Sequence, residues 1–97
     1  MATGQGTSTV DFGSGQGVNE ISVVVTGQGA ISATSKAEAY IMGDDTTANH
    51  TAKDHRWLAG QVGITCGTPT AATGFTIYVT SSQKQTGQYQ LRWVWAD

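Results

Sequence analysis

The sequence has few charged residues, one cysteine and one proline, and these shortages exclude several classes of protein. Charged side chains make up 12% of the 97 residues, and the formal net charge is −2 with no basic cluster. A nucleic-acid-binding protein needs a basic surface that neutralises phosphates, so we expect no nucleic-acid partner. No apolar run is long enough to cross a bilayer, so we expect no membrane insertion.

The single cysteine, Cys66, has no partner for a disulfide within the chain. The first residues are polar and do not form a signal peptide. These two observations predict a protein made in a cytoplasm. Cys66 alternates with Val62 and Ile64, which is typical of a buried thiol that packs as a small hydrophobic group rather than of a nucleophile.

Alternating hydrophobic residues are what the sequence does contain, most clearly near its end. Residues 75–80 and 88–96 both alternate with a period of two, as half-buried strands do. A polar turn is expected between them at 81–87. One face of each strand carries large apolar side chains, so we expect Trp93 or Trp95 in the core. These residues are Phe75, Ile77, Val79, Tyr89, Leu91, Trp93 and Trp95.

Further strands are predicted at residues 10–12, 19–26, 35–42 and 57–66. The segment 35–42 is ambiguous, and its length and its neighbours favour a strand over a short helix. The spacing predicts an all-β fold, a small antiparallel β-sandwich of about six strands. The polar segment 43–56 is a long loop, or a loop with one helical turn near residues 51–55. Residues 1–9 have no apolar period, so we expect a polar N-terminal arm, ordered only by contact with neighbouring chains, ahead of one domain at 10–97.

The long polar loop and one exposed ring are the candidate binding residues. The loop carries carboxylates and imidazoles, but their spacing matches no metal motif and we expect neither a metal nor a cofactor. No serine or cysteine stands in a catalytic motif, so we expect no enzyme. Loops on rigid sheets are common binding sites, and we expect a protein partner here. The candidates are Asp44, Asp45, His50, Asp54, His55, Arg56 and, on the outer face of its strand, Tyr78.

The order of these parts carries a resemblance. Val10-Asp11-Phe12-Gly13 stands near the start, and Val23-Val24-Val25-Thr26-Gly27-Gln28 and Glu38-Ala39-Tyr40-Ile41-Met42 follow. An Asp/His-rich loop and the closing hairpin, which ends in Leu91-Arg92-Trp93-Val94-Trp95-Ala96, complete it. This pattern resembles the small virion structural proteins of tailed bacteriophages. The resemblance implies a non-enzymatic protein on the virion surface, in a capsid decoration or a tail or fibre, that contacts other virion proteins.

The closing hairpin also resembles, more weakly, the H-type lectin module, a six-stranded sandwich that forms trimers. This resemblance implies a homotrimer and, as the alternative function, a receptor-binding module that binds a host-surface glycan. The sugar site of the lectin falls in the turn, where this chain has Ser81-Ser82-Gln83-Lys84-Gln85 and no aromatic ring. The departure counts against glycan binding and leaves the fold unaffected.

Overall fold

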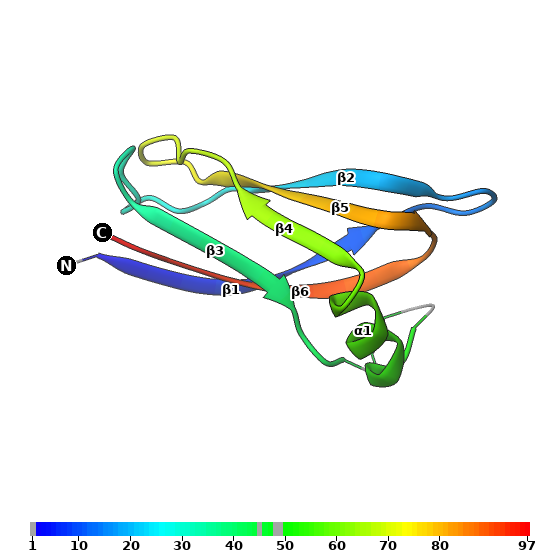
Figure 1. The fold of residues 1–97 in the computed structure, drawn as a ribbon. Helices are drawn as coiled ribbons and strands as arrows, with labels where there is room; N and C mark the ends of the chain where they lie inside the picture. The colour runs from blue at the N-terminus through cyan, green and yellow to red at the C-terminus, as the bar shows by residue number, and fades with distance from the viewer. Residues whose placement is uncertain (1, 45, 48–49) are drawn as a thin grey trace.

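The computed structural model describes residues 2–44, 46–47 and 50–97, and the described chain is an all-β sandwich with one short helix (Figure 1). Two three-stranded antiparallel sheets pack face to face, with strand orders β1-β6-β3 and β2-β5-β4. The elements are β1 Thr3–Asp11, β2 Val18–Val25, β3 Lys36–Ile41, α1 Ala52–Ala59, β4 Val62–Cys66, β5 Phe75–Gln85 and β6 Gln88–Ala96. The predicted fold class is confirmed.

The core lies between the two central strands, β5 and β6, whose inner faces were the ones predicted from alternation. Trp93 and Trp95 are 6% and 3% exposed, so both rings are buried. The ring of Phe75 in β5 meets the ring of Trp93 in β6 edge to face, with 5.6 Å between ring centroids. This contact joins the two sheets, because the two strands belong to different layers.

Residues 3–9 are not an arm, which corrects the sequence-based prediction. They form β1, which pairs with β6 along its whole length, from Thr3 opposite Ala96 to Asp11 opposite Gln88. The inner face of β1 carries Gly4 and Gly6, and the indole rings of Trp95 and Trp93 lie over these two positions. The apolar surface that covers β1 therefore comes from β6, which is why β1 itself has no apolar period.

The segment before β4 is a helix rather than the beginning of a strand. The prediction of a strand at 57–66 is correct only from Val62, and Trp57 lies in α1. The suggested helical turn near residues 51–55 is the start of α1, whose buried residues are His55 and Leu58. Likewise, the predicted turn at 81–87 shrinks to Thr86 and Gly87, because β5 continues to Gln85.

The first and last described residues lie together at one end of the sandwich (Figure 1). The Ser35 hydroxyl donates to Asp97 Oδ1 at 2.7 Å, and the Ala2 backbone N–H donates to Asp97 Oδ2 at 3.1 Å. These hydrogen bonds, led by that from Ser35, lower the pKa of Asp97. In the described part of the chain, no helix is long and apolar enough to cross a membrane.

Candidate assembly surface

Strands β3 and β4 run side by side at the edges of their two sheets, without pairing to each other (Figure 1). In an antiparallel ladder, the backbone groups of alternate residues point toward and away from the partner strand. Met42 N–H donates to Gln90 C=O, which continues the β3–β6 register, so the backbone groups of Ala37, Ala39 and Ile41 point away from β6. This edge of β3 has no partner strand among the described residues.

The same alternation applies to β4. Gly67 N–H donates to Thr76 C=O in the β4–β5 register, so the backbone groups of Val62, Ile64 and Cys66 point away from β5. The two open edges, with their half-buried inward side chains, form what we call the β3–β4 seam. Its residues are Ala37, Ala39, Ile41, Val62, Ile64 and Cys66.

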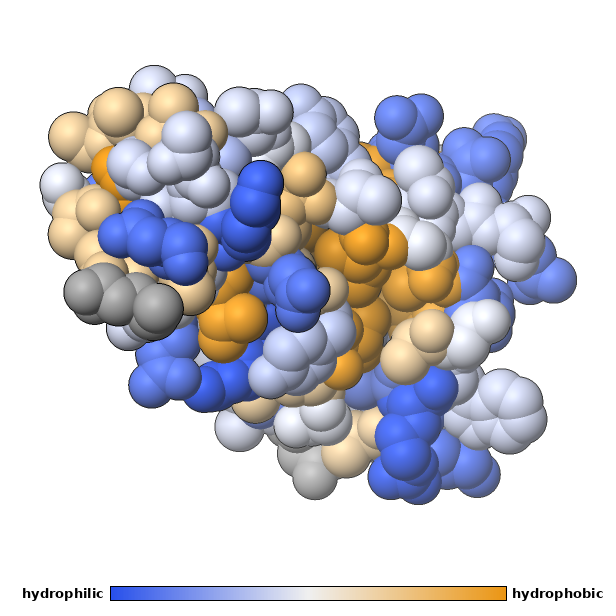
Figure 2. All heavy atoms as spheres, turned by 60° about the vertical axis from the view of Figure 1, so that its left-hand side comes forward, coloured by the Kyte–Doolittle hydropathy of each residue, from blue (hydrophilic) through white to orange (hydrophobic). Residues whose placement is uncertain are grey.

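Hollows follow the β3–β4 seam from one end to the other. The first lies between residues 35–38 and residues 66–69, and the second between residues 37–40 and residues 64–66. The third, at the far end, is lined by Ile41 and Val62 together with Ala59 of α1. A space-filling view of this side of the molecule shows hydrophobic side chains that reach the surface between polar ones (Figure 2). Two open strand edges beside exposed apolar groups are suited to binding another protein.

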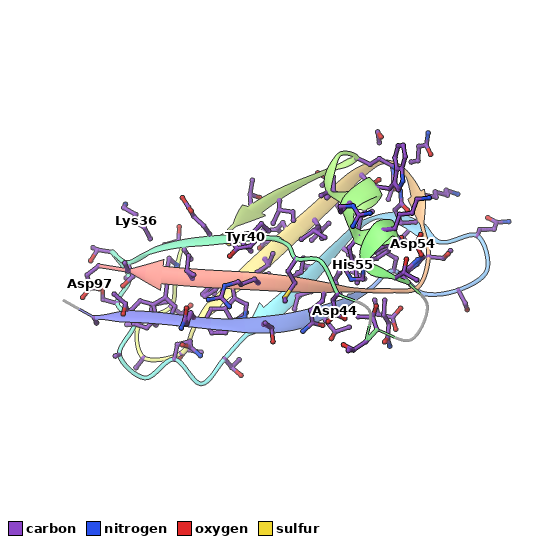
Figure 3. The ribbon with its side chains drawn as sticks, turned by 90° about the horizontal axis from the view of Figure 1, so that it is seen from below. Lys36, Tyr40, Asp44, Asp54, His55 and Asp97 are labelled. Carbon is purple, nitrogen blue, oxygen red and sulfur yellow. The ribbon has the colours of Figure 1, made fainter. Side chains whose placement is uncertain are left out.

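The outer face of β3 adds charge beside the β3–β4 seam. Lys36, Glu38 and Tyr40 are the exposed residues of β3, with Lys36 at the start of the strand and Tyr40 near its end (Figure 3). Neither Lys36 nor Glu38 forms an ion pair with another residue that the structure describes. Partial burial, and then the charge of Glu38, raise the pKa of Cys66, so its thiol stays protonated near neutral pH.

A shallow hollow of about 730 Å³ crosses the outer face of the sheet β1-β6-β3. Val94 and Ala96 of β6 line the middle of the hollow. Lys36 and Glu38 of β3 line one side, and Thr3 and Gln5 of β1 line the other. Trp95 also lines the hollow, but its ring is buried on the inner face over Gly4 and offers no platform for a sugar ring. The acidic and basic groups of the hollow lie on one strand. The hollow therefore extends the charged border of the β3–β4 seam.

Asp44, Asp54 and His55, three of the predicted loop residues, lie around α1 at the end of the molecule opposite Asp97 (Figure 3). Thr51 and Asp54 form a capping box, in which the Asp54 N–H donates to the Thr51 hydroxyl and the Thr51 N–H donates to the Asp54 carboxylate. The Thr51 backbone hydrogen bond, and then the His50 side chain, lower the pKa of Asp54. Asp54 thus stabilises a helix start, a structural role.

His50 fastens this helix start to the β5–β6 turn. Its ring stacks on Tyr89 with 4.0 Å between centroids, its Nδ1 lies 3.2 Å from the Asp54 carboxylate, and its Nε2 donates to Thr86 C=O at 2.7 Å. Both ring nitrogens therefore face acceptors. Asp44 caps a local turn, where the Thr46 hydroxyl donates to its carboxylate and lowers its pKa. Neither side chain is free to bind a partner without losing these contacts.

His55 is fully buried, with 0% exposure, although we predicted it as a partner-binding residue. Its Nδ1–H donates to Thr51 C=O at 2.7 Å, and its Nε2 accepts the Gln90 N–H at 2.9 Å. The side chain links α1 to the backbone of β6 and cannot meet another molecule on the surface. The prediction for His55 is therefore wrong, because the side chain is fully buried and both of its ring nitrogens are bonded within the molecule.

The remaining predicted residues do not form one patch with the loop. Arg56 is exposed on α1, and Tyr78 is 45% exposed on the outer face of β5, in the other sheet. Asp45 lies outside the described residues. Sequence reasoning missed Trp57, which is 67% exposed on α1 next to Arg56. The Thr51-x-x-Asp54 spacing is the signal that indicates a helix start and an outward-facing Trp57.

Among the residues that the structure describes, no group of three or more His, Cys, Asp or Glu side chains could hold a metal ion. Nor do the described histidines offer Cys66 a base, since the ring nitrogens of both are already engaged. Comparison with protein-family models, with curated proteins and with solved structures finds no match. The open β3–β4 seam is thus the feature that best indicates a function.

Proposed function

We propose that this chain is a non-enzymatic structural protein on the surface of a bacteriophage particle. In this proposal it packs against copies of itself and against other virion proteins, as a capsid decoration or as part of a tail or fibre. The observation that carries it is the β3–β4 seam, where two unpaired strand edges flank half-buried apolar side chains. The location on the particle is proposed from the resemblance of the chain to small virion proteins. A homotrimer is proposed from the resemblance of its closing hairpin to the H-type lectin module.

Sparse charge supports an assembling protein over a freely diffusing one. Few charged groups need to lose water when two such surfaces meet, and desolvation of charge is a main cost of association.

The alternative, a carbohydrate-binding receptor module, gains no support from this geometry. The lectin resemblance locates the sugar site in a turn at residues 81–85, but these residues lie in β5. The Gln85 side-chain amide donates to Gln61 at 2.9 Å and to Ser81 at 3.3 Å, so it is already engaged within the molecule. Binding of the free protein to a glycan array would be the result that favours this alternative.

The test is the composition of purified particles. Particles from a lysate of the source are banded in a density gradient, and their proteins are quantified by mass spectrometry. We expect this chain in the particle band at a fixed ratio to the major virion proteins, resistant to a salt wash. A chain that is expressed but found only in the soluble fraction would contradict the proposed location.

A further inference from the structure

We propose that the open edge of β3 pairs with β3 of a second copy of this chain, in antiparallel orientation, about a two-fold axis beside Ala37. The two sheets β1-β6-β3 would then join into one six-stranded sheet across the dimer. This inference rests on the proposed function and deepens it by naming the surface that assembles and its partner, and it proposes a two-fold pair in place of the homotrimer that the lectin-like hairpin suggests. It concerns the free protein in solution, so it can be tested without particles.

The helix decides which end of β3 is available. Ala59 of α1 lines the hollow beside Ile41 and Val62, so a second chain that paired at that end would have to share the space with the helix. The other end, from Lys36 to Ala39, has no helix beside it, and its hollows are bordered only by residues 33–40 and 64–69. A second copy therefore has access to β3 around Ala37, rather than around Ile41.

The backbone groups at this end are arranged for pairing. Ala37 and Ala39 point their N–H and C=O groups away from β6, as the β3–β6 register requires. Across a two-fold axis at Ala37, Ala37 would face its own copy and exchange two hydrogen bonds. Ala39 would face Ser35, whose C=O can accept from Ala39 while its N–H already donates to Ser32 C=O. Small alanine side chains let the two inner faces meet without a clash.

Charge selects this register over its neighbours. Antiparallel pairs about Ala37 place Lys36 opposite Glu38 of the second copy, and the two-fold axis repeats that pair. A shift of the axis to Glu38 would place two glutamates opposite each other, and opposed like charges destabilise a sheet. A shift to Ala39 would place Glu38 opposite Tyr40 and leave Lys36 without a carboxylate. The sequence Lys36-Ala37-Glu38 is thus complementary to itself in only one of these registers.

The experiment uses charge reversal on the full chain. In Lys36→Glu, the new carboxylate would lie opposite the Glu38 carboxylate of the second copy. In Glu38→Lys, the new ammonium group would lie opposite the Lys36 ammonium group of the second copy. Each single variant should dimerise about 10- to 100-fold more weakly than the wild type at low salt, as sedimentation equilibrium measures it. An equal mixture of the two variants should form a heterodimer, and the double variant Lys36→Glu/Glu38→Lys should dimerise like the wild type. Lys84→Glu, a charge reversal at an exposed position of β5, is the control and should change nothing.

Circular dichroism melts of every variant check that the fold is intact, since all these side chains are exposed. Cys66 supplies a second measurement, because it is half-buried in the β3–β4 seam and is the single cysteine of the chain. Its reaction with a small thiol reagent should slow as the wild type becomes dimeric, but not in the single variants at the same concentration.

A wild type that is monomeric at high micromolar concentration would overturn the pairing. Single variants that dimerise as well as the wild type would also overturn it, and so would a mixture of the two variants that does not form a dimer. A trimer would overturn it in favour of the lectin-like assembly. The two proposals fail separately: a monomer in solution that is present in particles refutes only the pairing, whereas a solution dimer absent from particles refutes only the location.

Discussion

At the scale of single residues, glycine and tryptophan complement each other across β1 and β6. A Cβ atom on Gly6 would lie 2.5 Å from Cζ2 of Trp93, and one on Gly4 would lie 2.5 Å from Cε2 of Trp95. Each ring also has its indole N–H bonded: Trp93 to the Ser8 hydroxyl at 3.1 Å and Trp95 to the Gln28 side chain at 3.0 Å. The rings are therefore fixed in place and cannot easily move aside for a new side chain.

Gly6→Ala should consequently destabilise the fold by about 1–3 kcal/mol, the usual cost of overpacking a core. Chemical denaturation monitored by tryptophan fluorescence measures it, and near-ultraviolet circular dichroism should show a changed environment for Trp93. Gly29→Ala is the matched control, because nothing lies within 4 Å of the added Cβ atom and the backbone there needs no positive φ. Equal stability of both variants would show that Trp93 does not lie over Gly6.

His55 supports a second prediction at the residue scale. His55→Leu fits an apolar site but leaves the Gln90 N–H without its acceptor, and an unsatisfied buried donor costs about 1–3 kcal/mol. Urea denaturation should show this loss, whereas Arg56→Leu on the exposed neighbour should stay within about 0.5 kcal/mol of the wild type. Nitrogen NMR should also find His55 as the Nδ1–H tautomer. The Nε2–H tautomer would contradict the described hydrogen bonds.

At the scale of elements, what the sequence could predict depended on where the apolar groups of each strand come from. β5 and β6 carry their own alternating apolar residues, so the pattern predicts them correctly. β3 carries mainly small apolar residues, so its pattern is ambiguous, and its length and its neighbours are what favour a strand over a short helix. β1 was missed because Gly4 and Gly6 contribute no side chain and β6 supplies the rings. α1 was read partly as strand because only His55 and Leu58 are buried in it, and one of these is polar.

The candidate site was harder to predict for a different reason. Loop polarity pointed to residues that cap α1 or fasten it to the β5–β6 turn, since a capping carboxylate and a binding carboxylate look alike in sequence. The open edge of β3 is a property of sheet order, which local patterns do not contain. Lys36 and Glu38 became informative only once the register showed which backbone groups beside them are unpaired.

Acid should destabilise the fold, because three carboxylates accept hydrogen bonds that favour their ionised form. The pKa values of Asp44, Asp54 and Asp97 are lowered from 3.8 in the folded chain, so each contributes stability that is present above that value. The contribution is lost as the pH falls through the lower folded values. We expect the melting temperature to fall below about pH 4. Asp54→Asn should melt below the wild type at pH 7, and the two curves should converge toward pH 2.

Glu20→Gln is the control for this measurement, because Glu20 is exposed on β2 and bonds no described side chain. Its melting temperature should follow that of the wild type at every pH. A constant gap between Asp54→Asn and the wild type down to pH 2 would mean that the Asp54 charge does not stabilise the helix start.

At the scale of the whole molecule, the fold is closed by strands that are far apart in the chain. β1, near the start, pairs with β6, near the end, and the rings of Trp93 and Trp95 lie under β1. The end of the sandwich is further fastened where Asp97 accepts from Ser35 and Ala2. Since β6 is the centre of its sheet, neither β1 nor β3 can form a sheet without it. Loss of either terminal segment therefore affects the whole core rather than one edge.

Deletion of residues 2–9 should therefore abolish cooperative unfolding, which reverses the expectation for a dispensable arm. The deletion removes most of β1, turns β6 into an edge strand and exposes Trp93 and Trp95, against a total stability of only about 5–15 kcal/mol for a domain. Thermal melts followed by tryptophan fluorescence measure the loss. Thr7→Ala keeps the strand and alters only its outer face, so it should melt nearly as the wild type does. A synthetic peptide of residues 1–12, added to the deletion variant, should restore the transition by pairing with β6. A deletion variant that melts cooperatively at the wild-type temperature without the peptide would show that β1 adds nothing to the fold.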